Sequence, residues 1–128
     1  MFETRFNIKL LTAAILFIAA VLVFSHLPLP QEAMPFPLQK DGVDKLEHVL
    51  VYGLITFLFL LSLRTSPTML SALLLFLLVS AIGAFDELTQ PFVNRTANIA
   101  DLVADIVGII AVLFFSTMRR RWFLRPNS

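Results

Sequence analysis

The segment GAFDELTQ, residues 83–90, places acidic and amide side chains at the end of a long apolar stretch. Asp86 and Glu87 are adjacent carboxylates, and we expect Asp86 to pair with Gln90 across one helical turn. Oxygen ligands of this kind can bind a divalent cation, and carboxylates can also exchange protons with a substrate. Because ionisable groups are costly in lipid, this position indicates either a functional site or a packing network.

A second set of ionisable residues, in the segment DKLEHVLVY, is spaced for one face of a helix. Asp44, His48 and Tyr52 are four residues apart, and Lys45 joins the same face. His48 could act as an acid or base beside a carboxylate, while Lys45 could hold a phosphate or carboxylate. In a simpler interpretation, Asp44 and Glu47 form a capping box at a helix start, and Lys45 extends to the membrane interface.

The last apolar stretch carries two acids near its start and follows a loop with one basic residue. Asp101, Asp105 and Gly108 share a helix face, and Gly108 would let a second helix approach closely. Asn98 and Asp101 could form a capping box, but Asp105 lies too far along the helix to be a cap. Arg95 could bind a phosphate or carboxylate through two parallel hydrogen bonds, or could be an ordinary loop charge.

The composition is that of an integral membrane protein. Of the 128 residues, 58% are hydrophobic, and the mean hydropathy is +0.84, whereas soluble domains are about 45–50% apolar. The formal net charge is only +1, so the charge gives no reason to expect nucleic-acid binding. The chain contains no cysteine, which excludes disulfide bonds and thiolate chemistry.

Four apolar stretches, extended into their flanks, predict four membrane-spanning helices. A spanning helix needs about 20 residues, which places the helices at about 8–27, 45–64, 68–88 and 99–118. We therefore predict an all-α membrane protein, a four-transmembrane-helix bundle that forms a single domain of residues 1–128.

The basic residues gather on one side of the predicted membrane. Seven of the ten would lie there with a single acid, and the other side would hold three basic and eight acidic residues. Because Lys and Arg are retained on the cytoplasmic side, we predict cytoplasmic termini in a multi-pass protein of the bacterial cytoplasmic (inner) membrane. The seven residues are Arg5, Lys9, Arg64, Arg119, Arg120, Arg121 and Arg125. The proline-rich loop after the first helix is expected to cover the outer mouth of the bundle.

Counting along the helices places the polar residues at one level. At a rise of 1.5 Å per residue, a hydrocarbon core about 30 Å thick takes about 20 residues from each cytoplasmic anchor. By this count Asp86 and Glu87 lie at the outer boundary. His48 lies about 6 Å inside that boundary and Asp105 about 9 Å inside it, and we expect His26 near the same level. The sequence thus predicts a polar layer at the outer side, to which three or four helices contribute.

Two residue patterns resemble the VanZ-like family of small bacterial integral membrane proteins. One is D-K-x-x-H in the second predicted helix, and the other is G-x-x-D-E-x-x-Q-x-F at the end of the third. The resemblance covers residues 41–112, and the chain departs from the family pattern at Asp105, where Asn is frequent, and in a loop before Arg95 that is one residue shorter. The matching residues are Asp44, Lys45, Leu46, Glu47, His48, Tyr52, Gly83, Asp86, Glu87, Gln90, Phe92, Arg95, Asp101 and Gly108.

The polar layer leads to three functional hypotheses. In the first, it binds or processes a cell-envelope lipid or lipid-linked substrate, and the resemblance implies a link to glycopeptide (teicoplanin) resistance without implying a reaction. In the second, the chain is a non-catalytic accessory protein, and the layer is a structural network that fixes helix packing. The third, ion or proton transfer, is the weakest because the cytoplasmic halves of the four helices are apolar.

The candidate site consists of nine polar side chains. Those expected to bind a substrate are Asp44, Lys45, His48, Asp86, Glu87, Gln90, Arg95, Asp101 and Asp105. No catalytic residue is assigned, and the candidates for acid or base chemistry are His48, Asp86, Glu87 and Asp105. A divalent cation would be held by Asp86, Glu87, Asp101 and Asp105. Membrane lipids are the expected partners, and the apolar helix faces could equally meet lipid or a second copy of the chain.

Overall fold

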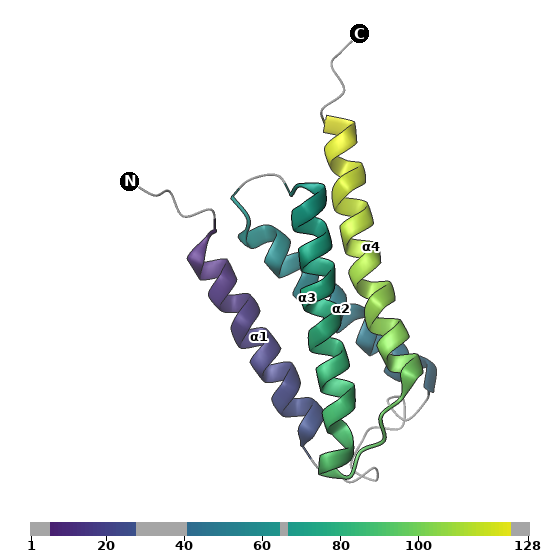
Figure 1. The fold of residues 1–128 in the computed structure, drawn as a ribbon. Helices are drawn as coiled ribbons and strands as arrows, with labels where there is room; N and C mark the ends of the chain where they lie inside the picture. Colours follow the sequence, from purple (N-terminus) through teal and green to yellow (C-terminus); the bar gives the residue numbers. More distant parts are fainter. Residues whose placement is uncertain (1–5, 28–40, 65–66, 124–128) are drawn as a thin grey trace.

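The protein is an all-α four-helix bundle, as the sequence predicts (Figure 1). A computed structural model describes residues 6–27, 41–64 and 67–123. In the described part of the chain, β-structure is limited to one isolated bridge between Phe6 and Leu63. The elements are α1 (Ile8–His26), α2 (Asp41–Ser62), α3 (Met69–Thr89), the short 3-10 helix η3 (Gln90–Val93) and α4 (Ile99–Phe123).

All four α-helices are long and apolar enough to cross a membrane. The candidate spans are Ile8–His26, Gly42–Ser62, Met69–Val93 and Ile99–Arg119. A helix satisfies its backbone hydrogen bonds within the segment, which is why apolar spans in lipid adopt this form. Large apolar side chains are exposed along the outer faces of the bundle, among them Leu16, Leu73 and Phe115. Such faces suit a hydrocarbon environment, and the chain is a multi-pass membrane protein.

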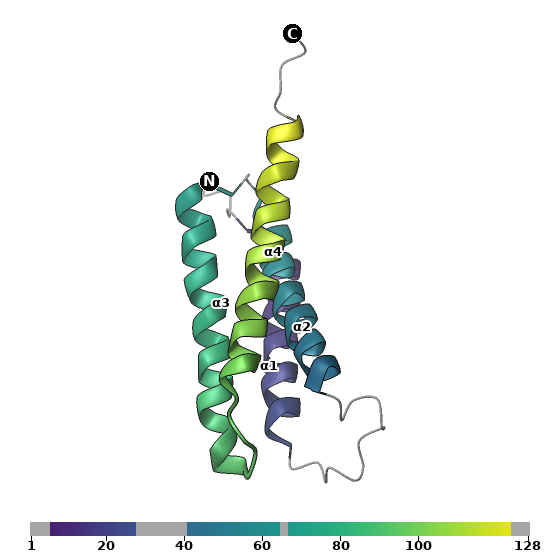
Figure 2. The same cartoon turned by 90° about the vertical axis from the view of Figure 1, so that its right-hand side faces the viewer.

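Helix α2 packs most closely against α4, and the two cross at a pair of small residues (Figures 1 and 2). A Cβ atom added to Gly108 would overlap the carbonyl oxygen of Val49, so only glycine permits this approach. Gly53 lies on the α2 side of the same crossing, where an added Cβ would be 3.5 Å from the Gly108 carbonyl oxygen. The close approach predicted for Gly108 is therefore confirmed, and it brings the polar faces of α2 and α4 together.

An apolar core holds α2, α3 and α4 together between the polar residues and the basic helix ends. It consists of Tyr52, Ile55, Leu75, Val79 and Ile109. Each of these side chains is buried, and burial of a large apolar side chain stabilises a helical packing by dispersion contacts as well as by removal from solvent. Tyr52 lies at the end of this core that is nearest the polar residues, and its hydroxyl group contacts Asp86 in the polar layer.

The basic helix ends, which are the start of α1 and the ends of α2 and α4, lie at one end of the bundle (Figure 1). The backbone N–H of Asn7 donates to the carbonyl of Ser62 over 2.7 Å, which joins the start of α1 to the end of α2. Lys9, Arg64 and Arg119 lie near these ends. The opposite end carries the ionisable residues of α2, α3 and α4. The proline-rich loop predicted to cover that end lies outside the described residues.

The observed helix bounds correct one interpretation of the sequence. We predicted that α2 starts near residue 45, and one interpretation made Asp44 and Glu47 a capping box, but α2 already includes Asp41. Asp44 therefore lies within the helix and is not its cap. The error has a physical reason, because acidic residues are favourable throughout the first turn of a helix and do not mark one position. Helix α4 also continues to Phe123, beyond its predicted end.

Candidate functional site

Polar side chains from all four helices meet at the end of the bundle opposite the basic helix ends. Several are almost completely buried, with relative exposures of 2% for Asp86, 5% for Glu87 and 0% for Asp105. This is the polar layer that the sequence predicts. Its described members are Ser25, His26, Asp44, Lys45, His48, Tyr52, Asp86, Glu87, Thr89, Gln90, Asp101 and Asp105. Nine of them form two groups, one between α2 and α4 and one between α1 and α3, and the other three, Tyr52, Glu87 and Gln90, contact Asp86 or each other.

Two cross-helix pairs join α2 to α4. Nδ1 of His48 lies 2.8 Å from Oδ1 of Asp105, and Nζ of Lys45 donates to Oδ1 of Asp101 over 3.3 Å. The spacing explains both contacts, because each helix presents two residues on one face about one turn apart. The pairs differ in exposure: the side chain of Lys45 is 35% exposed, whereas that of His48 is 17% exposed. We call Asp44, Lys45, His48, Asp101 and Asp105 the α2–α4 group.

Asp105 occupies a space that a glycine on α3 leaves open. A Cβ atom added to Gly83 would lie 2.8 Å from Oδ2 of Asp105 and 3.2 Å from Cε1 of Tyr52. Oδ2 is buried and has no hydrogen-bond partner within the described residues. A buried polar atom without a partner is costly, so Asp105 is held here at the expense of stability.

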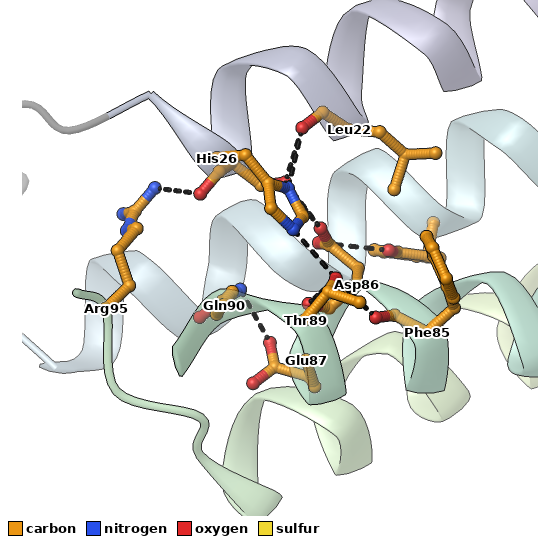
Figure 3. Close-up of polar contacts among 10 residues, drawn as sticks. Leu22, His26, Phe85, Asp86, Glu87, Thr89, Gln90 and Arg95 are labelled. Atoms are coloured by element: carbon orange, nitrogen blue, oxygen red, sulfur yellow. Dashed lines mark hydrogen bonds and ion pairs between the residues drawn. The ribbon is translucent and has the colours of Figure 1, made fainter. Parts of the chain in front are cut away.

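The second group surrounds Asp86 at the contact between α1 and α3 (Figure 3). The hydroxyl group of Ser25 donates to Oδ1 of Asp86 in a short hydrogen bond, and the hydroxyl of Tyr52 donates to Oδ2 over 3.4 Å. Nδ1 of His26 lies 3.6 Å from Oδ1 of Asp86. Nε2 of His26 lies 2.7 Å from Oγ1 of Thr89. We call Ser25, His26, Asp86 and Thr89 the α1–α3 group, whose polar atoms are directed at one another.

Glu87 connects the end of α3 to the start of α4. Its Oε1 accepts from Nε2 of Gln90 over 3.2 Å, and its Oε2 accepts from the backbone N–H of Asn98 over 2.9 Å. The side chain of Asn98 caps α4 by accepting from the N–H of Ala100 over 2.9 Å. The predicted capping box of Asn98 and Asp101 is therefore half correct, because Glu87 replaces Asp101 as the acceptor for the Asn98 N–H.

The predicted pairing of Asp86 with Gln90 is wrong for the side chains. The amide of Gln90 binds Glu87 instead, and only the backbone N–H of Gln90 donates to the carbonyl of Asp86. The reason is that the Asp86 carboxylate is turned toward Ser25 on α1. The adjacent carboxylates of the GAFDELTQ segment thus serve two different contacts.

Arg95 ties the loop after η3 to the end of α1 (Figure 3). Its Nη1 donates to the carbonyl of Ser25 over 2.6 Å, and its backbone N–H donates to the carbonyl of Gln90 over 3.1 Å. Asn94 adopts a left-handed conformation with φ of 61°, which turns the chain here. Arg95 forms no ion pair with any described carboxylate, so its charge is not matched within the part of the chain that the structure covers.

The carboxylates predicted as cation ligands do not converge. Asp86 and Glu87 make the contacts described above, whereas Asp101 and Asp105 pair with Lys45 and His48. Another set does converge among the residues that the structure describes. Ligand atoms of Asp44, His48 and Asp101 all lie within 4.8 Å of one another.

Hydroxyl groups are the part of the site that sequence reasoning missed. Ser25 and Thr89 complete the α1–α3 group, although neither was a candidate residue. Ser25 directly precedes His26 at the outer end of the first span, and this adjacency was the available signal. His26, expected at this level, is also part of the group. Below the layer, the buried hydroxyls of Thr56 and Ser62 donate to carbonyls of their own helix.

The two groups differ in what they could do chemically. The α1–α3 group is built from contacts that satisfy one another, as a packing network requires. The α2–α4 group contains partly exposed Lys45 and His48, together with Asp44, which forms no hydrogen bond with another described residue. Comparison with protein-family models, with curated proteins and with solved structures gave no significant match.

Proposed function

We propose that the protein binds the headgroup of a membrane lipid or of a lipid-linked cell-envelope substrate through its α2–α4 group. In this proposal the protein resides in the bacterial cytoplasmic membrane with both termini in the cytoplasm, so the polar layer is on the outer side. The distribution of Lys and Arg supports that orientation. On the residue patterns given above, we also propose that the chain is VanZ-like.

The observation that carries the proposal is the exposure of ionisable groups at the edge of an apolar bundle. Lys45 and His48 are partly exposed at the end of a membrane span, where lipid headgroups meet the hydrocarbon core. Both can donate a hydrogen bond to a phosphate or carboxylate oxygen. Arg95, which no described carboxylate neutralises, adds a further cation at the same end.

Binding alone accounts for these features, and processing would require an additional group. His48 is positioned by Asp105 and has the chemistry of an acid or base. The α2–α4 group contains no hydroxyl or thiol side chain that could act as a nucleophile. We therefore assign a binding role to the group and no reaction.

The second candidate is a non-catalytic accessory role in which the whole layer only fixes helix packing. The α1–α3 group favours it, because Ser25, His26 and Thr89 engage Asp86 and one another directly. A network of this kind specifies which helix faces meet. The exposed members of the α2–α4 group are not needed for that purpose, and this difference separates the two candidates.

Mass spectrometry of lipids that copurify with the protein tests the proposal. The full chain would be purified in mild detergent from bacterial membranes, and its lipids would be compared with those of the parent membrane. We expect enrichment of a lipid with an anionic headgroup in the wild type. Lys45→Ala should reduce that enrichment ~10-fold, since a charge-assisted hydrogen bond is lost.

Glu47→Gln is the matched control, because Glu47 is an exposed acid on the same turn of α2. It should retain the lipid at the wild-type level. Lipids present in the same proportions as in the parent membrane would contradict the proposal, as would equal enrichment in the wild type and Lys45→Ala.

A further inference from the structure

We propose that Asp44, His48 and Asp101 form a binding site for a divalent transition-metal ion, with Asp105 as the residue that orients His48. The three ligand atoms lie within 4.8 Å of one another. Ligands of a tetrahedral ion are ~3.3 Å apart when the metal–ligand bonds are ~2.0–2.1 Å, so the side chains must close by at most ~1.5 Å. The side chain of Asp44 has the freedom to do so, because it is half-buried and forms no side-chain hydrogen bond to another described residue.

The positions of the three ligands follow from the packing of α2 on α4. Asp44 and His48 are four residues apart on one face of α2, and Asp101 faces them from the first turn of α4. The close crossing at Gly108 sets this distance, since it brings the two backbones into contact two turns below Asp101. The ligand set therefore belongs to the rigid helical part of the molecule.

Asp105 gives independent support, because it lies outside the three ligands and binds one ring nitrogen of His48. Nδ1 of His48 is 2.8 Å from Oδ1 of Asp105, so Nε2 would be the ring atom that binds the metal in this proposal. Metal-binding histidines almost always use their second nitrogen in this way, with a carboxylate or carbonyl that fixes the ring and its tautomer. Asp105 is fully buried, and its charge is directed at His48.

The charges of the α2–α4 group are compatible with a bound cation. The group holds three carboxylates and one ammonium group, so two negative charges are in excess when His48 is neutral. Uncompensated charges at the edge of a membrane core are unfavourable, and one divalent ion would balance them. The ammonium group of Lys45, 3.3 Å from Asp101, occupies part of the same space. Lys45 is therefore a competitor of the metal ion.

The ligand atoms indicate the class of metal. One imidazole nitrogen with two carboxylate oxygens suits Zn²⁺ or Mn²⁺ better than Mg²⁺ or Ca²⁺, which prefer oxygen alone. Three protein ligands leave at least one coordination position for water or for an oxygen of a phosphate group. The inference goes beyond lipid binding, because metal binding can be measured without added lipid.

Metal content and metal affinity of the purified full-length protein test this inference. The protein would be treated with a chelator, exchanged into chelator-free detergent buffer and titrated separately with Zn²⁺, Mn²⁺ and Mg²⁺ by calorimetry. We expect one Zn²⁺ or Mn²⁺ per chain and much weaker binding of Mg²⁺. Asp44→Asn and Asp105→Asn should each weaken binding ~10-fold or more.

Two further variants distinguish a specific metal site from nonspecific attraction of cations to the acidic side chains. Lys45→Ala should bind the metal more tightly, because the competing ammonium group is removed, whereas Glu47→Gln should bind like the wild type. Asp44→Asn is the deciding variant, since it removes one ligand charge and keeps the size of a half-buried side chain. Less than one tenth of an ion per chain in the wild type would overturn the proposal, and so would an unchanged affinity in Asp44→Asn.

Discussion

Nδ1 of His48 on α2 lies 2.8 Å from Oδ1 of Asp105 on α4, and the other oxygen of Asp105 has no described partner. The pair therefore depends on a single contact inside the bundle. His48→Ala should lower the free energy of unfolding by about 3–5 kcal/mol, because a buried carboxylate loses its partner. Thermal unfolding of the purified variant in detergent measures this loss.

Asp105→Asn provides the comparison for that prediction. An asparagine can still form a hydrogen bond with His48 and carries no charge to bury, so we expect the free energy of unfolding to fall by about 1 kcal/mol at most. The double variant with His48→Ala and Asp105→Asn should lose less free energy of unfolding than the sum of the losses in the two single variants, since they share one interaction. Additive effects would show that the two residues do not stabilise each other.

The crossing of α2 and α4 gives a second prediction. Gly108→Ala should destabilise the protein by about 3 kcal/mol or more, because its Cβ would overlap the Val49 carbonyl and neither backbone can move alone. Gly42→Ala is the matched control: no atom lies within 4 Å of its added Cβ, so it should be neutral or slightly stabilising. Size-exclusion profiles after heating would compare them, and equal melting temperatures would refute the packing described here.

The contact between α3 and α4 gives a third prediction. Glu87→Ala should lower the free energy of unfolding by about 1–2 kcal/mol, because both the amide of Gln90 and the N–H of Asn98 lose their acceptor. Glu87→Gln retains one acceptor oxygen, and its melting temperature should lie between those of the wild type and the alanine variant. Thermal unfolding in detergent gives the ranking, and a Glu87→Ala protein as stable as the wild type would contradict it.

The orientation in the membrane gives a fourth prediction, which the absence of native cysteine makes easy to test. Thr96→Cys and Thr68→Cys each add one thiol at an exposed position at opposite ends of the bundle. With cytoplasmic termini, a membrane-impermeant maleimide should label Thr96→Cys in intact bacterial cells and Thr68→Cys only after lysis. The reverse pattern would place the polar layer on the cytoplasmic side.

The level of the polar layer could be predicted from the sequence because helix geometry converts residue counts into distances. Counting from the basic anchors places Asp86, His48 and Asp105 at one end, and their contacts across helices confirm that they gather there. The prediction of four spans holds for the same reason, since each apolar stretch has the length that a membrane requires.

The partners within the layer could not be predicted, because they depend on how each helix is rotated about its axis. Asp86 and Glu87 are neighbours in sequence, yet one faces Ser25 on α1 and the other faces Asn98 before α4. Periodicity gives the face that residues share but not the helix that this face meets. The hydroxyl of Ser25 was missed for that reason, and Gln90 was paired with the wrong carboxylate.

The central claim is that the polar layer has two roles: the α1–α3 group holds the helices together, and the α2–α4 group binds a ligand. Lys45→Ala and Asp86→Ala separate these roles when thermal stability and bound lipid are measured on the same folded samples. Lys45→Ala should reduce the amount of bound lipid ~10-fold. It should change the free energy of unfolding by less than about 1 kcal/mol, as expected for a partly exposed ion pair. Asp86→Ala should lower the free energy of unfolding by about 3 kcal/mol, because Ser25 and Tyr52 lose their acceptor. Each folded molecule of this variant should still bind its lipid. A Lys45→Ala protein that retains the lipid, or an Asp86→Ala protein as stable as the wild type, would contradict the claim.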